Sequence, residues 1–320
     1  MHNQRRRFFG YVLMALLVAL FVAALVSTTP TALASTAQEK LVIRYFDLEV
    51  EDRDSLPANV DPDVTSGDVI LITTPDGQHI MIDSTVPHLG TALVTRLREL
   101  GVEKLHYAFA THPHVDHIGG YQTLLDHIPV DVFYQINLPY ETSGNYHRLQ
   151  NAIARNNVTM EYVECGDVFQ IGEVRLEALN PPRGTSRETV PGDMQMPTAF
   201  VNDLSLVLRL DYKDFSMLFT GDIYMAREME LLDAFPADKL KVDILDVPHH
   251  GCVSSSSTIF LMTVDPKYAI ISMDGICSTP VYNKYLQRGI EVFITGYNGE
   301  ITIVTDGDEI EITTEKELRN

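Results

Sequence analysis

The chain of 320 residues contains no tryptophan and only three cysteines, Cys165, Cys252 and Cys277. An odd number of cysteines at no metal-ligand spacing does not indicate a disulfide framework or a zinc–thiolate site. Cys252 follows the stretch His249-His250-Gly251 and could lie near it, but the sequence favours a buried, inert thiol at this position. Cysteine therefore contributes little to the chemistry that we expect.

Positive charge is also scarce. The 24 lysines and arginines are outnumbered by 44 acidic residues, which gives a net charge of -20 at pH 7. No block of like charges produces this value, so it is a property of the whole surface that favours solubility and repels polyanions. Nucleic acid is disfavoured as a partner, because its binding usually requires a basic surface. The length and the hydrophobic content of 45% suit one large α/β domain.

A long apolar run occurs at the N-terminus, over residues 8–26, after three arginines at 5–7 and before Ala-Leu-Ala at 32–34. This order is typical of a secretory signal peptide over residues 1–34, and the twin arginines resemble a Tat export signal. An uncleaved membrane anchor is the alternative, because the run is near the lower limit for spanning a bilayer. We expect an exported protein, extracellular or in the cell envelope, whose mature domain covers residues 35–320. Removing the first 34 residues takes away three arginines and no acid, leaving 21 basic against 44 acidic residues, a net charge of -23.

Beyond the N-terminus, hydrophobic alternation and turn residues predict mixed strands and helices. Two stretches break this pattern. The acidic segment at 49–66 is expected to be a solvated insertion. Residues 180–202 form a loop without periodicity, either a lid that faces the substrate or a disordered insertion. We predict strands over 41–48, 68–74, 79–83, 105–110, 130–135, 160–164, 173–179, 204–210, 215–219, 242–247, 268–272, 290–293 and 301–304, and helices over 90–100, 121–127, 146–156, 223–232 and 280–288.

The most informative stretch is Thr-His-Pro-His-Val-Asp-His-Ile-Gly-Gly over residues 111–120, directly after a predicted buried strand. Three histidines and an aspartate at a strand end suit a metal site, because imidazole binds zinc and carboxylate oxygen admits a harder ion. Alternation along an extended loop sends His112 and His114 to one side, while Asp116 and His117 turn towards a second position. The pattern predicts two metals. The competing interpretation is a histidine-rich surface loop.

Two later stretches also carry candidate ligand residues directly after a predicted strand. Thr220-Gly221-Asp222 places a carboxylate where it can bridge two metals, although an aspartate at this point is often the N-cap of a following helix. Pro248-His249-His250-Gly251 supplies paired histidines, one of which we expect to be the last metal ligand.

With these stretches, the chain resembles the metallo-β-lactamase-fold hydrolases. The resemblance is strongest to the metallo-β-lactamase domain of ComEC-type competence proteins and their free-standing relatives, including phosphorylcholine esterases. It implies a four-layer αββα sandwich with the metals at one edge, between the two sheets. It covers nearly all of the mature chain, through stretches at 46–47, 67–68, 82–83, 112–120, 202–208, 219–222, 247–251 and 298–303.

The resemblance also implies roles for individual residues. The cofactors implied are two divalent metal ions, with zinc favoured over manganese. Asn202 is expected to line the substrate pocket, at the place where many relatives carry a further histidine. The implied ligands are His112 and His114 for the first metal and Asp116, His117 and His250 for the second, with Asp222 as the bridge and His249 beside the site, although His249 and His250 could be exchanged.

Hydrolysis is the implied activity. The two ions lower the pKa of a shared water, giving a metal-bridged hydroxide, and Asp116 orients or deprotonates that water. His249 binds the leaving group or a phosphate oxygen. We expect a phosphodiesterase that acts on a small or cell-surface phosphoester. The alternatives are a secreted nuclease of the competence type, a lactone or ester hydrolase, and a non-catalytic binding protein on the same fold. A β-lactamase is disfavoured, because the further histidine is missing.

Overall fold

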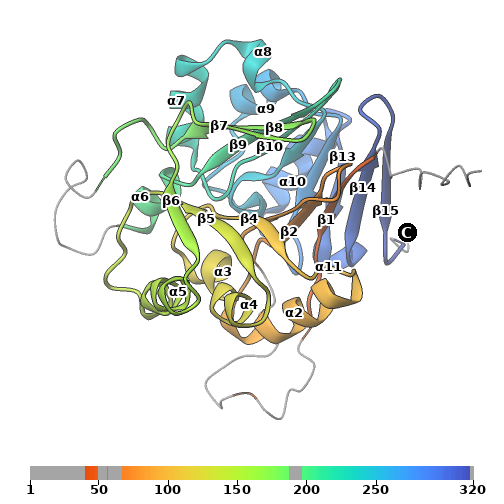
Figure 1. Ribbon diagram of the computed structural model, residues 1–320. Coiled ribbons are helices and arrows are strands. Elements are labelled where there is room, and N and C mark those ends of the chain that lie inside the picture. Colours follow the sequence, from red (N-terminus) through yellow and green to blue (C-terminus); the bar gives the residue numbers. More distant parts are fainter. Residues whose placement is uncertain (1–39, 50–55, 57–66, 187–196, 318–320) are drawn as a thin grey trace, which may run out of the picture. The chain divides into compact units, whose positions relative to one another are not determined.

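Two mixed β-sheets lie face to face at the centre of the fold, as seen in the computed structural model (Figure 1). The structure describes residues 40–49, 56, 67–186 and 197–317. The expected signal peptide or anchor, nearly all of the acidic insertion and the middle of the 180–202 loop lie outside these residues. Within the described ranges, no helix combines the length and apolar character needed to cross a bilayer.

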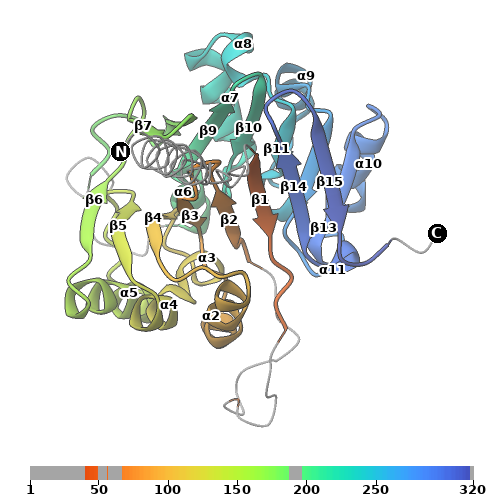
Figure 2. The same ribbon diagram turned by 45° about the vertical axis from the view of Figure 1, so that its right-hand side comes forward.

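The first sheet has eight strands and the second has seven (Figure 2). In spatial order, the first contains β15 (Ile310–Thr314), β14 (Ile301–Thr305), β1 (Leu41–Tyr45), β2 (Ile70–Thr73), β3 (His79–Ile82), β4 (Leu105–Ala110), β5 (Val130–Gln135) and β6 (Thr159–Tyr162). The second contains β13 (Glu291–Ile294), β12 (Tyr268–Ile271), β11 (Ile244–Asp246), β10 (Phe215–Phe219), β9 (Val207–Tyr212), β8 (Val174–Asn180) and β7 (Val168–Ile171).

The main core fills the space between the sheets. Because side chains alternate along a strand, Ile70 and Ile72 of β2 face this core while Leu71 faces the other side of the sheet. In β10, Met217 likewise faces the core between the sheets and Leu218 the opposite side. Both faces of each sheet are therefore apolar and need a cover.

Helices supply that cover on the two outer faces (Figure 1). Leu93 and Leu97, four positions apart on one helix, are both buried against the first sheet. The first sheet is covered by α2 (Gly90–Glu99), α4 (Tyr121–His127) and α5 (Gly144–Arg155), and the second by α7 (Met225–Ala234), α9 (Thr258–Val264) and α10 (Thr279–Leu286). The predicted αββα sandwich is confirmed. Shorter helices are η2 (Pro87–Leu89), α3 (Val115–Ile118), α6 (Thr198–Asp203), α8 (Ala237–Leu240), η3 (Pro248–Gly251) and α11 (Thr295–Asn298).

Each sheet has a parallel region, and these regions position the site. Strands β3 to β6 run parallel in the first sheet, and β10 to β13 in the second. The carboxyl ends of parallel neighbours lie at the same edge of a sheet, so the loops after them meet there. The ligand-bearing stretches follow β4, β10 and β11, which places all of them at such edges.

Two predictions need correction. The end of the 180–202 loop is not irregular, because residues 198–203 form α6. Cys252 is not a free thiol, since it forms a disulfide with Cys277, with the two Cα atoms 5.0 Å apart. These cysteines are 25 positions apart in the chain, on loops after different strands, and they meet only because β11 and β12 are neighbours.

Candidate metal centre

The first group of ligands comes from the segment after β4 and from the loop after β10. The Nε2 atom of His112 lies 2.9 Å from Nδ1 of His114 and 3.7 Å from Oδ2 of Asp222. One ligand atom from each of these three residues lies within 4.8 Å of the others, a geometry suited to a metal ion.

The second group contains Asp116, His117, His250 and the same Asp222. Oδ1 of Asp222 lies 3.4 Å from Nε2 of both His117 and His250. Oδ2 of Asp116 is 3.6 Å from Nε2 of His250 and 3.7 Å from Nε2 of His117. Asp222 thus presents one oxygen to each group, and the structure brings all six predicted ligands together. Asp222 does not cap α7, which begins three residues later.

Unpaired buried atoms test whether a cation fits this place. Nε2 of His117, Nε2 of His250 and Oδ1 of Asp222 find no hydrogen-bond partner within the described part of the chain. Each such atom costs about 1–3 kcal/mol when it is buried without a partner. All three converge on the second group, where nitrogen and oxygen donors of this kind bind divalent ions. The residues therefore fit a metal.

Contacts behind the ligands fix the orientation of their rings. Nδ1 of His117 donates to Oδ2 of Asp83 at 2.7 Å, and Nδ1 of His250 donates to the carbonyl oxygen of Ser272 at 2.8 Å. Both Nε2 atoms are left to face the cluster, as is usual for metal-binding histidines. Asp83 is itself held by the backbone N–H and the hydroxyl of Thr111, at 2.7 and 2.6 Å.

Asp68 stands behind both of these histidines. Its carboxylate oxygens lie 3.7 Å from Nδ1 of His250 and 3.8 Å from Nδ1 of His117. Sequence reasoning assigned no role to Asp68 or Asp83. The available signal was an aspartate beside a strand in the stretches 67–68 and 82–83, which the family resemblance includes.

Charge is concentrated in the cluster. Burial opposes protonation of His250, but Asp222 and neighbouring carboxylates outweigh it and raise its pKa to about 10. The pKa of His117 is raised well above its usual value in the same way. Burial, and then the charge of His117, hold the pKa of His112 well below its usual value. Without metal, His117 and His250 therefore carry protons at the place where a cation fits.

His249 lies beside the ligands rather than among them. Both histidines of the pair have left-handed backbone angles, with φ of 50° and 52°. His250 turns into the cluster, while His249 stays 21% exposed with Nε2 at 3.8 Å from Oδ2 of Asp222. Its Nδ1 shares a short hydrogen bond with the hydroxyl of Ser254, and its ring packs on Tyr224 with centroids 4.8 Å apart. Of the two histidines that the sequence left open, His250 is the one that lies in the second group.

Asn202 is buried on α6 beside the first group. Burial lowers the pKa of His114, and a contact with the Asn202 side chain opposes that shift.

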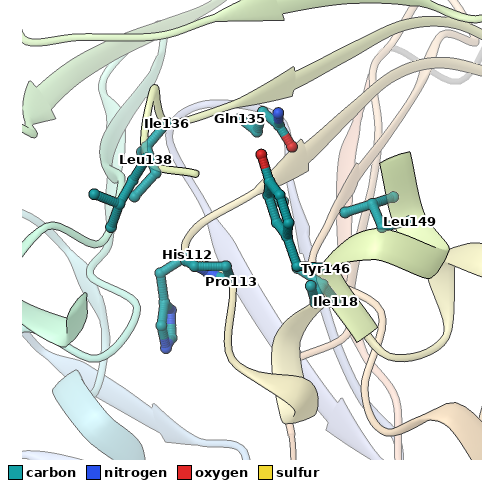
Figure 3. A pocket seen from close by; sticks show the side chains of 9 residues that line it. His112, Pro113, Ile118, Gln135, Ile136, Leu138, Tyr146 and Leu149 are labelled. Carbon is teal, nitrogen blue, oxygen red and sulfur yellow. The ribbon is translucent and has the colours of Figure 1, made fainter. Parts of the chain in front are cut away.

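A small, mainly apolar cavity is lined in part by His112, and Figure 3 shows that the His112 ring points away from it. The volume of this cavity, about 10 Å³, is roughly that needed for one water molecule, so it does not admit a substrate.

The chain is similar in sequence and in fold to known proteins. The Metallo-beta-lactamase superfamily profile matches residues 62–275. The chain is 30% identical over 184 residues to ComE operon protein 3 of Bacillus subtilis (strain 168), which covers 56% of this chain and 21% of that protein. It is 26% identical over 246 residues to competence protein ComA of Neisseria gonorrhoeae, covering 75% of this chain and 31% of that protein.

The chain therefore spans about a fifth to a third of the length of these curated relatives. Among solved structures, the metallo-β-lactamase fold protein YhfI from Bacillus subtilis matches with a TM-score of 0.53 at 11% identity, covering 83% of this chain and 99% of that one. This likeness concerns the fold alone. From the profile match and the HxHxDH cluster, the chain belongs to the metallo-β-lactamase superfamily.

Proposed function

We propose that this protein is an exported hydrolase that cleaves phosphodiester bonds with two divalent metal ions, for which zinc is favoured over manganese. Metal-dependent hydrolysis is supported by the superfamily and by the His/Asp cluster. The observation that carries the use of two metals is the position of Asp222. Its two carboxylate oxygens face two separate groups of ligands, as expected of a bridging carboxylate.

The residues of the chain have distinct tasks in this proposal. When bound, the two ions lower the pKa of water and withdraw charge from the ester that is attacked. Asp116, whose side chain is 34% exposed, is placed to orient the attacking water. His249, held by Ser254 and Tyr224, is placed to donate to the leaving group or to a phosphate oxygen.

The first group favours a phosphoester over a β-lactam. Its set of His112, His114 and Asp222 has no further histidine, and buried Asn202 occupies that neighbourhood. Asn202 and His249 can both donate hydrogen bonds to anionic phosphate oxygens. The net charge of -20 disfavours a long polyanion, so a small or cell-surface phosphoester is the substrate class proposed.

A nuclease is the second candidate, favoured by the similarity to two competence proteins.

Export has support beyond the apolar run at the N-terminus. The disulfide between Cys252 and Cys277 fits an oxidising compartment outside the cytosol, where such bonds persist.

Metal content and hydrolysis of bis-p-nitrophenyl phosphate by the purified protein test the proposal. We expect two zinc ions per chain and turnover that His114→Ala abolishes. His127→Ala is the matched control, because His127 is exposed at the end of α4 and contacts the carbonyl of Thr123 instead of the cluster.

The substrate follows from a comparison with p-nitrophenyl butyrate, a lactone and single-stranded DNA. Faster hydrolysis of single-stranded DNA than of bis-p-nitrophenyl phosphate would favour the nuclease over the proposed small-phosphoester hydrolase. Turnover of the carboxyl ester or lactone alone would refute phosphodiester cleavage. A protein that binds no metal would refute the hydrolase.

A further inference from the structure

We propose that the Cys252–Cys277 disulfide positions the His249–His250 pair, so that the second metal group depends on the oxidised state of these cysteines. The inference rests on the proposed function, because it concerns metal binding at His250. Cys252 lies two residues after His250. Cys277 lies on the loop after β12, the same loop that contains Ser272, whose carbonyl accepts the hydrogen bond from His250. The disulfide and this hydrogen bond therefore join the same two loops.

The backbone of the histidine pair needs such support. His249, His250 and Gly251 have φ of 50°, 52° and 74°, three successive residues in the left-handed region. This region is unfavourable for residues with a Cβ atom, and it persists only where the surroundings impose it. The N–H of His249 donates to the carbonyl of Gly221 at 3.0 Å, which fixes the start of the turn. The covalent link at Cys252 fixes its end.

The two metal groups depend on this turn to different degrees. His112 and His114 belong to the segment after β4, which the Thr111–Asp83 contacts hold in place. His250 comes from the turn itself and contributes to the second group alone. Opening the disulfide should therefore weaken the second group and leave the first nearly unchanged.

Reduction of this bond is chemically accessible. Cys277 is exposed and Cys252 is half-buried. A phosphine opens the bond by attacking one sulfur. The phosphorus is oxidised to the phosphine oxide with oxygen from water, and the two sulfurs, reduced by its two electrons, take up two protons to become thiols. The turn is then free to relax towards ordinary backbone angles, which moves His250 away from Asp222.

Zinc titration of the full chain tests the inference, with Cys252→Ser/Cys277→Ser compared with the wild type. We expect the dissociation constant of the first zinc to stay within about twofold and that of the second to rise by about tenfold or more, the range seen when a supporting contact behind a ligand is lost. Cys165→Ser is the matched control, because Cys165 is the free cysteine of the described part of the chain. Its binding should equal that of the wild type.

A second arm uses His250→Ala. In this background, removal of the disulfide should cause no further loss at the second site, because a coupled pair is not additive. If the double-serine variant does not fold, folded Cys165→Ser protein is treated with phosphine and its zinc binding is measured instead. Binding of the second zinc should weaken on reduction and return on reoxidation.

The outcomes separate the two proposals. Two zinc ions bound equally well with and without the disulfide would overturn the positioning role and leave the hydrolase intact. No zinc bound by the oxidised wild type would refute the proposed function and this inference together. Equal weakening of both zinc sites would also overturn it, since the disulfide would then act on the fold as a whole.

Discussion

Asp83→Ala probes the contacts behind the metal ligands. The Asp83 carboxylate accepts hydrogen bonds from the backbone N–H of Thr111, the hydroxyl of Thr111 and Nδ1 of His117, all between 2.6 and 2.7 Å. Its side chain is 0% exposed, so water cannot replace it. The alanine variant therefore leaves three buried donors without their acceptor.

The magnitude follows from what each donor can find instead. A buried donor without a partner costs about 1–3 kcal/mol. The Thr111 hydroxyl still has Nδ1 of His112 at 3.2 Å, and Nδ1 of His117 has Asp68 at 3.8 Å, so these two recover part of the loss. The backbone N–H has no such substitute. We expect the free energy of unfolding to fall by about 3–5 kcal/mol in total, and the affinity for the second zinc to fall about 10- to 100-fold.

Urea unfolding in the presence of a chelator measures the first effect without metal, and zinc titration measures the second. Asp83→Asn keeps the size and one acceptor oxygen, so its loss of stability should be smaller. Thr111→Val removes one hydroxyl and should cost about 1 kcal/mol. A loss below about 1 kcal/mol for Asp83→Ala, together with unchanged zinc affinity, would refute the supporting role that the hydrogen bonds indicate.

Three further predictions concern the other parts of the site. His250→Ala should bind the second zinc more weakly than the wild type, while His249→Ala should bind both zinc ions as the wild type does and lose about 10²- to 10⁴-fold in kcat, as expected for a proton donor. Equal weakening of zinc binding in both variants would contradict the placement of His249 outside the ligand set. The pKa of His250 is raised from 6.5 to about 10, so in metal-free protein its stabilising contribution is complete below pH 6.5 and is lost as the pH rises through about 10. Zinc added at pH 8 should therefore release protons, measured by calorimetry in buffers of different ionisation enthalpy, and His250→Ala should reduce that release. Cys252→Ser/Cys277→Ser should lower the free energy of unfolding by about 3.5 kcal/mol, from the entropy of a closed loop with a separation of 25 residues, whereas Cys165→Ser should leave it unchanged.

Local pattern was sufficient for most of the secondary structure. The apolar run at 105–110 and the strand-like stretch at 130–135 predicted β4 and β5 with the bounds that the structure shows. The periodicity at 90–100 likewise predicted α2. Weaker patterns were missed, among them α6, α9 and β15. α6 and α9 are short, and β15 has no fully buried residue and is held by its pairing with β14, so contacts with other elements determine them.

The candidate ligands were predicted for a different reason. His112, His114, Asp116 and His117 are close in the chain, so one strand end delivers all of them to one place. Asp222 and the pair His249-His250 were predicted as ligand residues at the ends of two later strands. The family resemblance then supplied their roles, because a local pattern does not say which strand ends meet. The structure places them in the cluster through the parallel order of β10, β11 and β12.

From residue type and short-range periodicity, the sequence alone predicted mixed strands and helices and the stretches that carry the candidate metal ligands. The αββα class followed from the family resemblance that those stretches carry. Tertiary structure alone decided the pairing of Asp83 with His117, 34 residues apart, the position of Asp68 behind two histidines and the disulfide between Cys252 and Cys277. It also decided which histidine of the pair turns into the cluster. These contacts join residues on different strands, and only the order of the strands in the two sheets brings them together.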